Sequence, residues 1–551
     1  MIGRSAYVDS TSAKGCNVLL SRTRRSILGA LCLVASALSL AVPRGAQAMG
    51  ELLCIITPQA GVPSGLSSPR VRRASSDEAS EILGILEKAS QAASGIGGEL
   101  EKVEVLSGIA EAQAKVGDVR AALQTAGKIP DQELRAYALE RLTASVAKAG
   151  DIRGALEIAA GITDQDTKST AYLHIVEAQL ASGDVPGALQ AAADIRPAVE
   201  RAFAFGRIGV ALSKVGDRIG AARHFQQAVQ IAAGIEEESL RAHILHRLAE
   251  AQTEGGDVRG ALQTALSSGG PGDKAKGLLA VGAAQARMGD GVGAKRTFRQ
   301  ALDAGARIRD KLGRDALFRS IAVAQAEAGD SRAASQTISR IHGKLDRACA
   351  LGGVAVAQAR RGDQGSSAKS FQQSVRVATT IAETSWKSQV LLDIATAQAQ
   401  MGHLGDSLKT ASMIPQDGWK ACALQHIAGA HANAGDAGGA LGIAAGITDE
   451  TMKRVALLRI ASVLARAGDV PRALQIAPLG DEFMKRRAIR GIAAALAMVG
   501  DTSGARRMAE SQGDPLVRAS TLLGVTEGLL ARIGHDVPQP VGADKCWPIV
   551  R

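Results

Sequence analysis

Large apolar residues recur through the middle of the chain at a fixed distance from a Gly-Asp pair. Eight residues before each Gly stands a large aliphatic residue, such as Ile109, Leu142 or Ile175, and three residues further upstream stands another apolar residue, such as Leu106 or Tyr172. This i, i+3 spacing predicts the buried stripe of a helix. The pairs begin at eleven glycines, and Gly402-His403 fills the one missing place: Gly117, Gly150, Gly183, Gly216, Gly256, Gly289, Gly329, Gly362, Gly435, Gly468 and Gly500.

The residues that follow each Gly predict a second helix. The Gly ends the first helix, and the Asp stands where an N-cap would hold the free amides of the next one. Small residues such as Ala122, Ala155 and Ala188 let the second helix lie close against the first. The glycines are 33 or 40 residues apart, with one interval of 32. This period predicts twelve helix-turn-helix units and a worn thirteenth copy near Leu523 to Gly534.

Some of the second helices carry a recognisable motif. An Ala-x3-Phe pattern is met best in three places, each in a unit followed by a 40-residue interval: Ala221 with Phe225, Ala294 with Phe298 and, more weakly, Ser367 with Phe371. In these units the seven extra residues lengthen the second helix by about two turns. The units resemble tetratricopeptide repeats, although glutamine replaces the family's aromatic residue in several first helices. The resemblance covers roughly residues 100–534 and implies an all-α fold, a right-handed superhelical solenoid of about 12 repeats.

The amino-terminal residues are typical of an export signal. A basic stretch precedes an apolar run from Ile27 to Val42, and Ala46-Gln47-Ala48 fits a cleavage site. The segment from Thr23 to Leu28, with Arg24 and Arg25, resembles the bacterial twin-arginine signal. We therefore expect a periplasmic or otherwise extracytoplasmic bacterial protein with no stable membrane span after cleavage. An organelle transit peptide or an uncleaved anchor is the alternative.

These observations divide the chain into five parts. We expect a signal peptide over 1–48, a flexible linker rich in Pro, Gly and Ser over 49–76, and an N-terminal capping helix over 77–100. The solenoid of tetratricopeptide-like repeats then covers 101–534, and a C-terminal tail with three prolines covers 535–551.

Charge and composition narrow the class of partner. The formal net charge is +11, but residues 1–48 carry +5 of it, so about 500 residues share the remaining +6. Aromatic residues make up only 2% of the chain. Because nucleic-acid sites need dense positive charge or aromatic stacking platforms, the sequence predicts no nucleic-acid partner.

Candidate catalytic motifs are explained by the repeat. The run from Gly289 to Lys295 has the wrong spacing for a phosphate-binding loop, and its glycines fall at the turn that every unit uses. His243 and His246 share a helical face, as do Cys422 and His426, but no further ligand stands at a suitable spacing. We therefore expect no catalytic site, no metal and no cofactor.

Two rows of polar residues recur once per unit. Seven glutamines end the first helices, and they are either a buried structural ladder or a polar strip on the concave wall: Gln113, Gln179, Gln252, Gln285, Gln325, Gln358 and Gln398. A basic residue stands fifteen positions before every turn Gly, for example Arg135, Lys168 and Arg241. We interpret the basic row as a strut between repeats, with a ligand site as the alternative.

The position just before the basic row becomes apolar and large in four consecutive units. Trp386, Trp419, Met452 and Met484 occupy it, and only three Trp exist in the chain. These residues either cover the preceding helix or form a docking strip, because Trp and Met are enriched where proteins bind. The sequence thus predicts a non-catalytic scaffold for a protein or peptide partner. The alternatives are an accessory subunit of an envelope enzyme complex and a passive structural protein without a specific ligand.

Overall fold

The computed structural model describes residues 74–477, 480 and 482–535. The predicted signal peptide lies outside these residues, as do all but the ends of the predicted linker and tail. Every regular element in the described part of the chain is an α-helix, which confirms the predicted all-α repeat solenoid.

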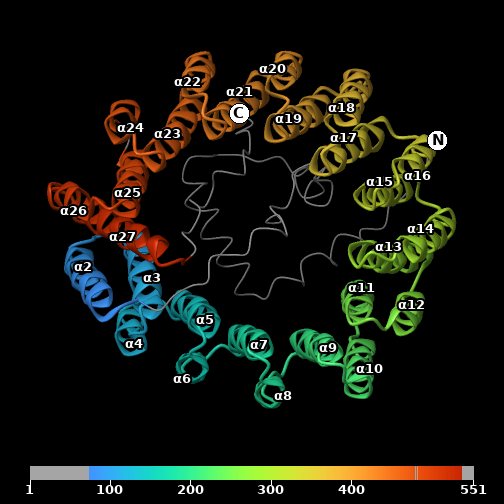
Figure 1. Ribbon diagram of the computed structural model, residues 1–551, viewed down its shortest axis with the longest axis horizontal. Helices are drawn as coiled ribbons and strands as arrows, with labels where there is room; N and C mark the ends of the chain where they lie inside the picture. The colour runs from blue at the N-terminus through green and yellow to red at the C-terminus, as the bar shows by residue number, and fades with distance from the viewer. Residues whose placement is uncertain (1–73, 478–479, 481, 536–551) are drawn as a thin grey trace, which may run out of the picture.

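The helices alternate between an inner and an outer layer (Figure 1). The inner helices are α3 (Glu99–Lys115), α5 (Gln132–Lys148), α7 (Gln165–Ala181), α9 (Ala198–Lys214), α11 (Glu238–Glu254), α13 (Pro271–Arg287), α15 (Lys311–Glu327), α17 (Lys344–Arg360), α19 (Thr384–Gln400), α21 (Asp417–Asn433), α23 (Glu450–Arg466), α25 (Glu482–Val499) and α27 (Pro515–Arg532). The outer helices are α2 (Ser76–Ser94), α4 (Val119–Gly127), α6 (Ile152–Ala160), α8 (Val185–Ala193), α10 (Arg218–Ala233), α12 (Val258–Ser267), α14 (Gly291–Gly305), α16 (Ser331–Ser339), α18 (Gln364–Thr379), α20 (Leu404–Ser412), α22 (Ala437–Ala445), α24 (Val470–Ile476) and α26 (Thr502–Glu510).

The turn between the two helices of a unit has the predicted chemistry. The glycine of every turn, including Gly402 and Gly534, has a positive φ between 81° and 107°, where a side chain is unfavourable. The Asp that follows then caps the outer helix, as Asp151 does by accepting the amide of Gly154 at 2.9 Å. The glycine is therefore needed for backbone reasons in every turn, and the aspartate caps the next helix wherever it is present, whereas His403 makes no such bond.

Apart from α2, three outer helices are longer than the rest, as the 40-residue intervals predict. Helices α10, α14 and α18 have 15 or 16 residues, whereas most other outer helices have nine. Each of the three buries a phenylalanine: Phe225, Phe298 or Phe371. Glycine on the inner helix makes room for the ring, because a Cβ on Gly209 would be 2.7 Å from Phe225 and one on Gly282 would be 2.8 Å from Phe298.

The array closes on itself into a ring, which the sequence did not lead us to expect (Figure 1). Helix α27 is the inner helix of the worn thirteenth unit, and no outer helix follows it within the described residues. Helix α2, from the segment predicted as a capping helix, lies against α27 and occupies that outer position. Both ends of the repeat array therefore contribute one helix each to the thirteenth unit.

Apolar packing and ion pairs hold the seam between the two ends. Ile82, Ile85 and Leu86 of α2 are buried in the same core cluster as Leu522 and Leu523 of α27. Three ion pairs cross the seam: Lys88 with Glu510 at 2.8 Å, Glu81 with Arg506 at 4.0 Å, and Glu104 with Arg486 at 3.2 Å.

Helix α27 also comes unusually close to α25. A Cβ on Gly524 would overlap the carbonyl oxygen of Arg490, and one on Gly528 would overlap that of Ala494. The two glycines are four residues apart and so form one smooth stripe on α27. This stripe lets the last two inner helices touch through their backbones.

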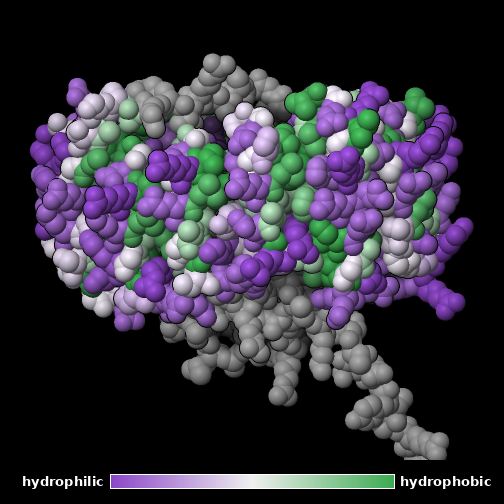
Figure 2. All heavy atoms as spheres, turned by 90° about the horizontal axis from the view of Figure 1, so that it is seen from below, coloured by the Kyte–Doolittle hydropathy of each residue, from purple (hydrophilic) through white to green (hydrophobic). Residues whose placement is uncertain are grey.

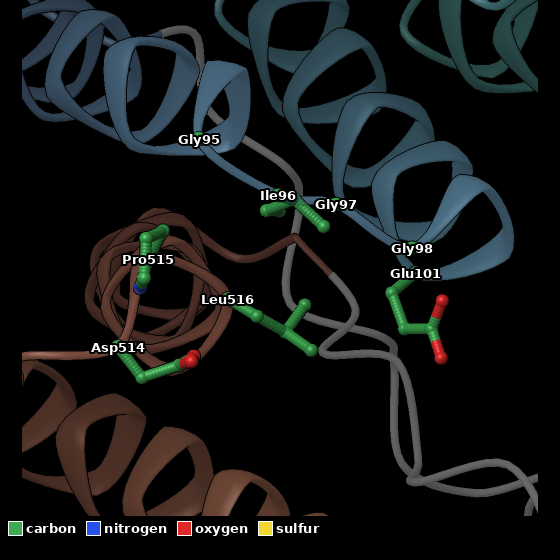
Figure 3. Close-up of a pocket in the computed structure, with 8 residues that line it drawn as sticks. All are labelled: Gly95, Ile96, Gly97, Gly98, Glu101, Asp514, Pro515 and Leu516. Atoms are coloured by element: carbon green, nitrogen blue, oxygen red, sulfur yellow. The ribbon is translucent and has the colours of Figure 1, made fainter.

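A small cavity of about 260 Å³ remains at the seam (Figure 3). The turn from Gly95 to Gly98 forms one side, and Asp514, Pro515 and Leu516 at the start of α27 form the other. The Asp514 side chain caps α27 and accepts a hydrogen bond from the amide of Val517 at 2.9 Å. The cavity is therefore a packing gap at the junction of the two ends.

Candidate binding surface on the inner wall

The exposed faces of the inner helices line the centre of the ring. An outer helix covers each inner helix on one side, and the neighbouring inner helices cover its flanks (Figure 1). Residues left exposed on an inner helix therefore face the central opening. We call this surface the inner wall.

A ladder of ion pairs links successive inner helices along one arc of the wall. Each pair joins a basic residue nine positions before its turn Gly to a glutamate on the preceding helix. The pairs are Arg141 with Glu111 at 2.5 Å, His174 with Glu140 at 3.2 Å, and Arg207 with Glu177 at 3.4 Å. The hydrogen bond to Glu140 is the main reason why the pKa of His174 is raised.

The ladder continues onto α11 and α13 with a shared acceptor. Glu250 pairs with Arg247 of its own helix at 2.7 Å and with Arg287 of α13 at 2.6 Å. Arg287 also contacts Glu254 at 3.3 Å. Because these side chains are partly exposed, each pair contributes less than about 1 kcal/mol to stability. Their main consequence is an even alternation of positive and negative groups on the wall.

Ring side chains stand one helical turn before three of the arginines. Tyr137 precedes Arg141, Phe203 precedes Arg207, and His243 precedes Arg247, each by four residues. Tyr137 is 45% exposed, His243 is exposed and Phe203 is half-buried. Burial, followed by the nearby positive charges of Arg247 and Lys276, lowers the pKa of His243, so this ring is neutral at pH 7. The wall from α5 to α11 thus presents flat rings beside paired charges.

On the opposite arc, from α15 to α21, none of the four inner helices has a glutamate six residues before its turn Gly. Gly353 and Val356 of α17 replace the base and the acid of the ladder, and Gly429 replaces the acid on α21. The place of a Cβ on Gly353 is only 2.6 Å from Val323 of α15. The two arcs of the wall therefore differ in polarity.

The predicted docking strip lies where four inner helices begin. Trp386, Trp419, Met452 and Met484 are each the third residue of their helix, in α19, α21, α23 and α25. All four are half-buried. Both Trp side chains pack against the same core cluster, which includes Leu391 and Ile414. The structure thus brings the four residues to one rim of the ring, and their role in binding stays a prediction.

An exposed ring beside this strip was missed by the sequence analysis. Phe483 precedes Met484 and is 51% exposed. The guanidinium groups of Arg486 and Arg487 lie 5.6 and 5.5 Å from the centre of its ring, within the range of cation–π contacts. The signal in the sequence was a lone Phe at the start of an inner helix.

The other two polar rows are structural. The glutamines of the first row are buried, and all except Gln398 bond to the outer helix of their own unit or to the Asp that caps it. Gln285, for example, accepts from Thr297 at 2.7 Å and donates to the capping Asp290 at 3.0 Å. This bonding excludes the alternative of a polar strip on the concave wall for that residue.

The basic row acts as the predicted strut between units. Arg241 donates to the carbonyl oxygen of Ile235 at 2.7 Å, and Arg135 donates to that of Ile129 at 3.1 Å. Both carbonyls lie just after the outer helix of the preceding unit, where positive charge is favourable. The side chains therefore fasten each unit to the one before it.

The described part of the chain has neither a metal-binding cluster nor a membrane-spanning helix. No group of three or more His, Cys, Asp or Glu side chains there is placed to hold a metal ion. None of the described helices has both the length and the hydropathy to cross a bilayer. On the side of the ring shown in Figure 2, apolar side chains form separate stripes between polar ones.

Comparison with known proteins adds the following. No protein-family model matches the sequence, and no curated protein is similar to it. Among solved structures, Ton1535 from Thermococcus onnurineus NA1 aligns over 58% of this chain and 98% of its own, with 18% identity and a TM-score of 0.27. A circular tandem repeat protein aligns over 83% and 97%, with 13% identity and a TM-score of 0.15. The pentatricopeptide repeat protein PPR10, in complex with an 18-nt psaJ RNA element, aligns over 79% and 93%, with 11% identity and a TM-score of 0.21.

One sequence-based prediction is corrected by these comparisons. We excluded nucleic acid as a partner because positive charge is dilute and aromatic residues are few. PPR10 is a helical repeat protein whose structure holds RNA, which contradicts that exclusion. The average composition of a repeat chain is a poor guide here, because one wall of a ring can gather charges and rings that the whole chain has in low density. The exclusion of nucleic acid is withdrawn.

Proposed function

We propose that this chain is a non-catalytic, exported scaffold that binds a protein partner on the inner wall of its ring. The single observation that carries the proposal is the arc from α5 to α11, where exposed ring side chains alternate with ion-paired arginines and glutamates. Protein surfaces carry charges of both signs, and they meet such an alternating wall with complementary pairs. Tyr and Arg are also among the residues that contribute most to protein–protein affinity.

The docking strip of Trp386, Trp419, Met452 and Met484 extends this proposal to the rim. A partner that enters the ring from the face where the inner helices begin meets the strip before the deeper ladder. The half-buried indoles support this, since part of each side chain still faces outward. The strip is then a second contact for the same partner.

Capture of the partner by matched variants tests the binding surface. The tagged mature chain is expressed in its native envelope and cross-linked, and the retained protein is compared with that of Tyr137→Ala/Arg207→Ala. Because both side chains are exposed, we expect this double variant to keep its melting temperature and to lose at least about tenfold in retained partner. Ile219→Ala, on an outer helix and 78% exposed, is the control that should retain it.

The same capture separates the alternatives. Equal retention by the double variant and loss in Trp386→Ala/Trp419→Ala would move the site from the wall to the strip. Retained material that disappears after ribonuclease treatment would replace the protein partner by RNA. Co-purifying enzymatic activity would identify an accessory subunit, and a lack of any retained molecule would favour the passive structural protein.

Export is tested on the amino-terminal arginines. Twin-arginine transport depends on the arginine pair, so we expect Arg24→Lys/Arg25→Lys to leave the precursor in the cytoplasm. Fractionation followed by immunoblotting measures this, with Arg22→Lys as the matched control. Unchanged export of the double variant would show another route, and a membrane-bound full-length chain would show an uncleaved anchor.

A further inference from the structure

Asp393 is an acidic residue at a ladder position that is basic on several other inner helices. It lies on α19 nine residues before its turn Gly402, where Arg141, His174 and Arg207 stand in their own units. Those basic residues pair with glutamates on the preceding helix, as Arg207 does with Glu177. On α17 the position equivalent to Glu177 is Val356. The fold therefore places an acid where a base is usual and gives it no counter-charge from the preceding helix.

One carboxylate oxygen of Asp393 is left without a hydrogen-bond partner among the described residues, although the residue as a whole is partly exposed. Its Oδ2 is out of contact with solvent and accepts no hydrogen bond from the described residues. One turn further along α19, the Oγ1 of Thr396 is buried and equally unpartnered. Asp393 and Thr396 are three residues apart, so they share one face of the helix. Two unsatisfied polar atoms thus belong to the same face of α19.

Charged groups on the adjoining helices do not compensate Asp393. Arg360 of α17 and His426 of α21 are basic residues on the two neighbouring inner helices. His426 Nδ1 lies 3.5 Å from the Arg459 guanidinium on α23, the next inner helix. Burial alone raises the pKa of Asp393 well above its ordinary value, without a contribution from any charge. An isolated buried carboxyl of this kind destabilises a fold at neutral pH.

We propose that Asp393 and Thr396 form a binding site for one arginine or lysine side chain of the protein partner. The inference rests on the proposed function and specifies the partner's chemistry. A guanidinium or ammonium group would donate to the carboxylate and to the threonine hydroxyl, which satisfies both orphan atoms. The aliphatic stem of that side chain would lie against the apolar part of the inner wall, so small apolar residues are expected beside it in the partner.

The melting temperature of Asp393→Asn tests whether the carboxylate lacks a partner within the chain. Because the folded pKa is raised, the folded chain keeps a proton that the unfolded chain releases above pH of about 4, so stability is lost as pH rises through the folded pKa. Asp393→Asn removes this loss and should melt at a higher temperature than the wild type at pH 7, with a smaller difference at pH 4. A lower melting temperature at pH 7 would reveal an internal partner for the carboxylate and overturn the proposal.

Selection of peptides then tests the ligand. A random dodecapeptide library displayed on phage is selected against the full chain, against Asp393→Asn and against Asp406→Asn. Asp406 is the control because it lies on the outer helix α20 and pairs there with Lys409 at 3.1 Å. We expect peptides with a basic residue among small apolar ones to be enriched by the wild type and by Asp406→Asn. Asp393→Asn should bind them about tenfold or more weakly, since a charge-assisted bond is lost.

Two results would contradict the proposal, and they have different meanings. Peptides that bind all three chains equally, or that lack a basic residue, would overturn the Asp393 site and leave the scaffold function standing. A library from which no chain enriches any peptide would count against the peptide-binding function itself and, with it, the site. As a second readout, calorimetry in two buffers should show that a selected peptide releases more protons from the wild type than from Asp393→Asn, because binding favours the charged carboxylate. Equal proton release by both chains would also overturn the site.

Discussion

Replacing Gly528 by leucine is expected to open the ring. A Cβ at this position would overlap the carbonyl oxygen of Ala494 and come within 2.7 Å of the side chain of Ala497, so α27 cannot stay against α25. Overpacking of a core typically costs about 1–3 kcal/mol, and a clash with backbone lies at the upper end because no side chain can move aside. We expect a larger hydrodynamic radius by size-exclusion chromatography with light scattering, since an open arc is longer than a ring.

A glycine with free space around it is the matched control for this variant. Gly442 lies on the outer helix α22, and nothing would meet its Cβ within 4 Å. Gly442→Leu should therefore keep the radius of the wild type. If Gly528→Leu also keeps that radius and the same stability, the close contact of α25 with α27 does not hold the seam.

Loss of two side chains from α2 is expected to release this helix from the seam. Ile85 and Leu86 are fully buried between α2, α3 and α27. Truncation of a buried Ile or Leu to Ala costs about 2–5 kcal/mol each, and these two side chains are a large part of the apolar contact of α2 with α3 and α27. In Ile85→Ala/Leu86→Ala, amide hydrogen exchange should become fast in α2 and faster in α27, while α13 and α15 on the far side remain protected.

Exposed apolar residues provide the comparison for the double variant. Ile219→Ala/Val292→Ala removes similar groups that are 78% and 75% exposed, and it should leave exchange in α2 unchanged. Uniform loss of protection around the whole ring in Ile85→Ala/Leu86→Ala would mean that the units unfold together. In that case α2 unfolds together with the rest of the ring and does not detach separately.

The repeat was predictable because its signals are local. The turn needs a glycine at positive φ and an aspartate that caps the next helix, so Gly117-Asp118 and its equivalents mark each unit directly. The long outer helices were predictable for the same reason, since Phe225 and Phe298 have a fixed place relative to the turn. These features depend on neighbours within one unit and are therefore visible in the order of residues.

Ring closure depends on a quantity that the sequence does not display. Each unit rotates slightly against the next, and only the sum of these rotations decides whether the ends meet. One sign of closure is that each end of the array has a helix without a partner in its own unit. Helix α2 precedes the first unit, and α27 follows the outer helix of the twelfth unit. The glycines of α27 that permit the contact, Gly524 and Gly528, looked like ordinary helix residues in a chain with 62 glycines.

The inner wall was missed for a related reason. Ladder pairs such as Arg141 with Glu111 join residues 30 positions apart, and their meaning appears only when the inner helices lie side by side. The lack of a counter-charge for Asp393 likewise involves another helix, because Val356 of α17 stands where a charged residue stands on α7. Aligning the units by their turn Gly could still have revealed the ladder and the exceptional Asp393. From α5 to α11 a basic residue recurs nine positions before that Gly.

Closure of the ring is tested most directly by a zero-length cross-linker. Lys88 Nζ and Glu510 Oε1 are 2.8 Å apart across the seam, although 422 residues separate them in the chain, and both side chains are about half exposed. A carbodiimide should join them within a single chain, as it should join Lys295 and Asp330, which are 3.2 Å apart between neighbouring units. The account predicts the Lys88–Glu510 link by mass spectrometry in the monomer. Formation of the Lys295–Asp330 link without it, or its appearance only in cross-linked dimers, would contradict a ring closed by the two ends of one chain.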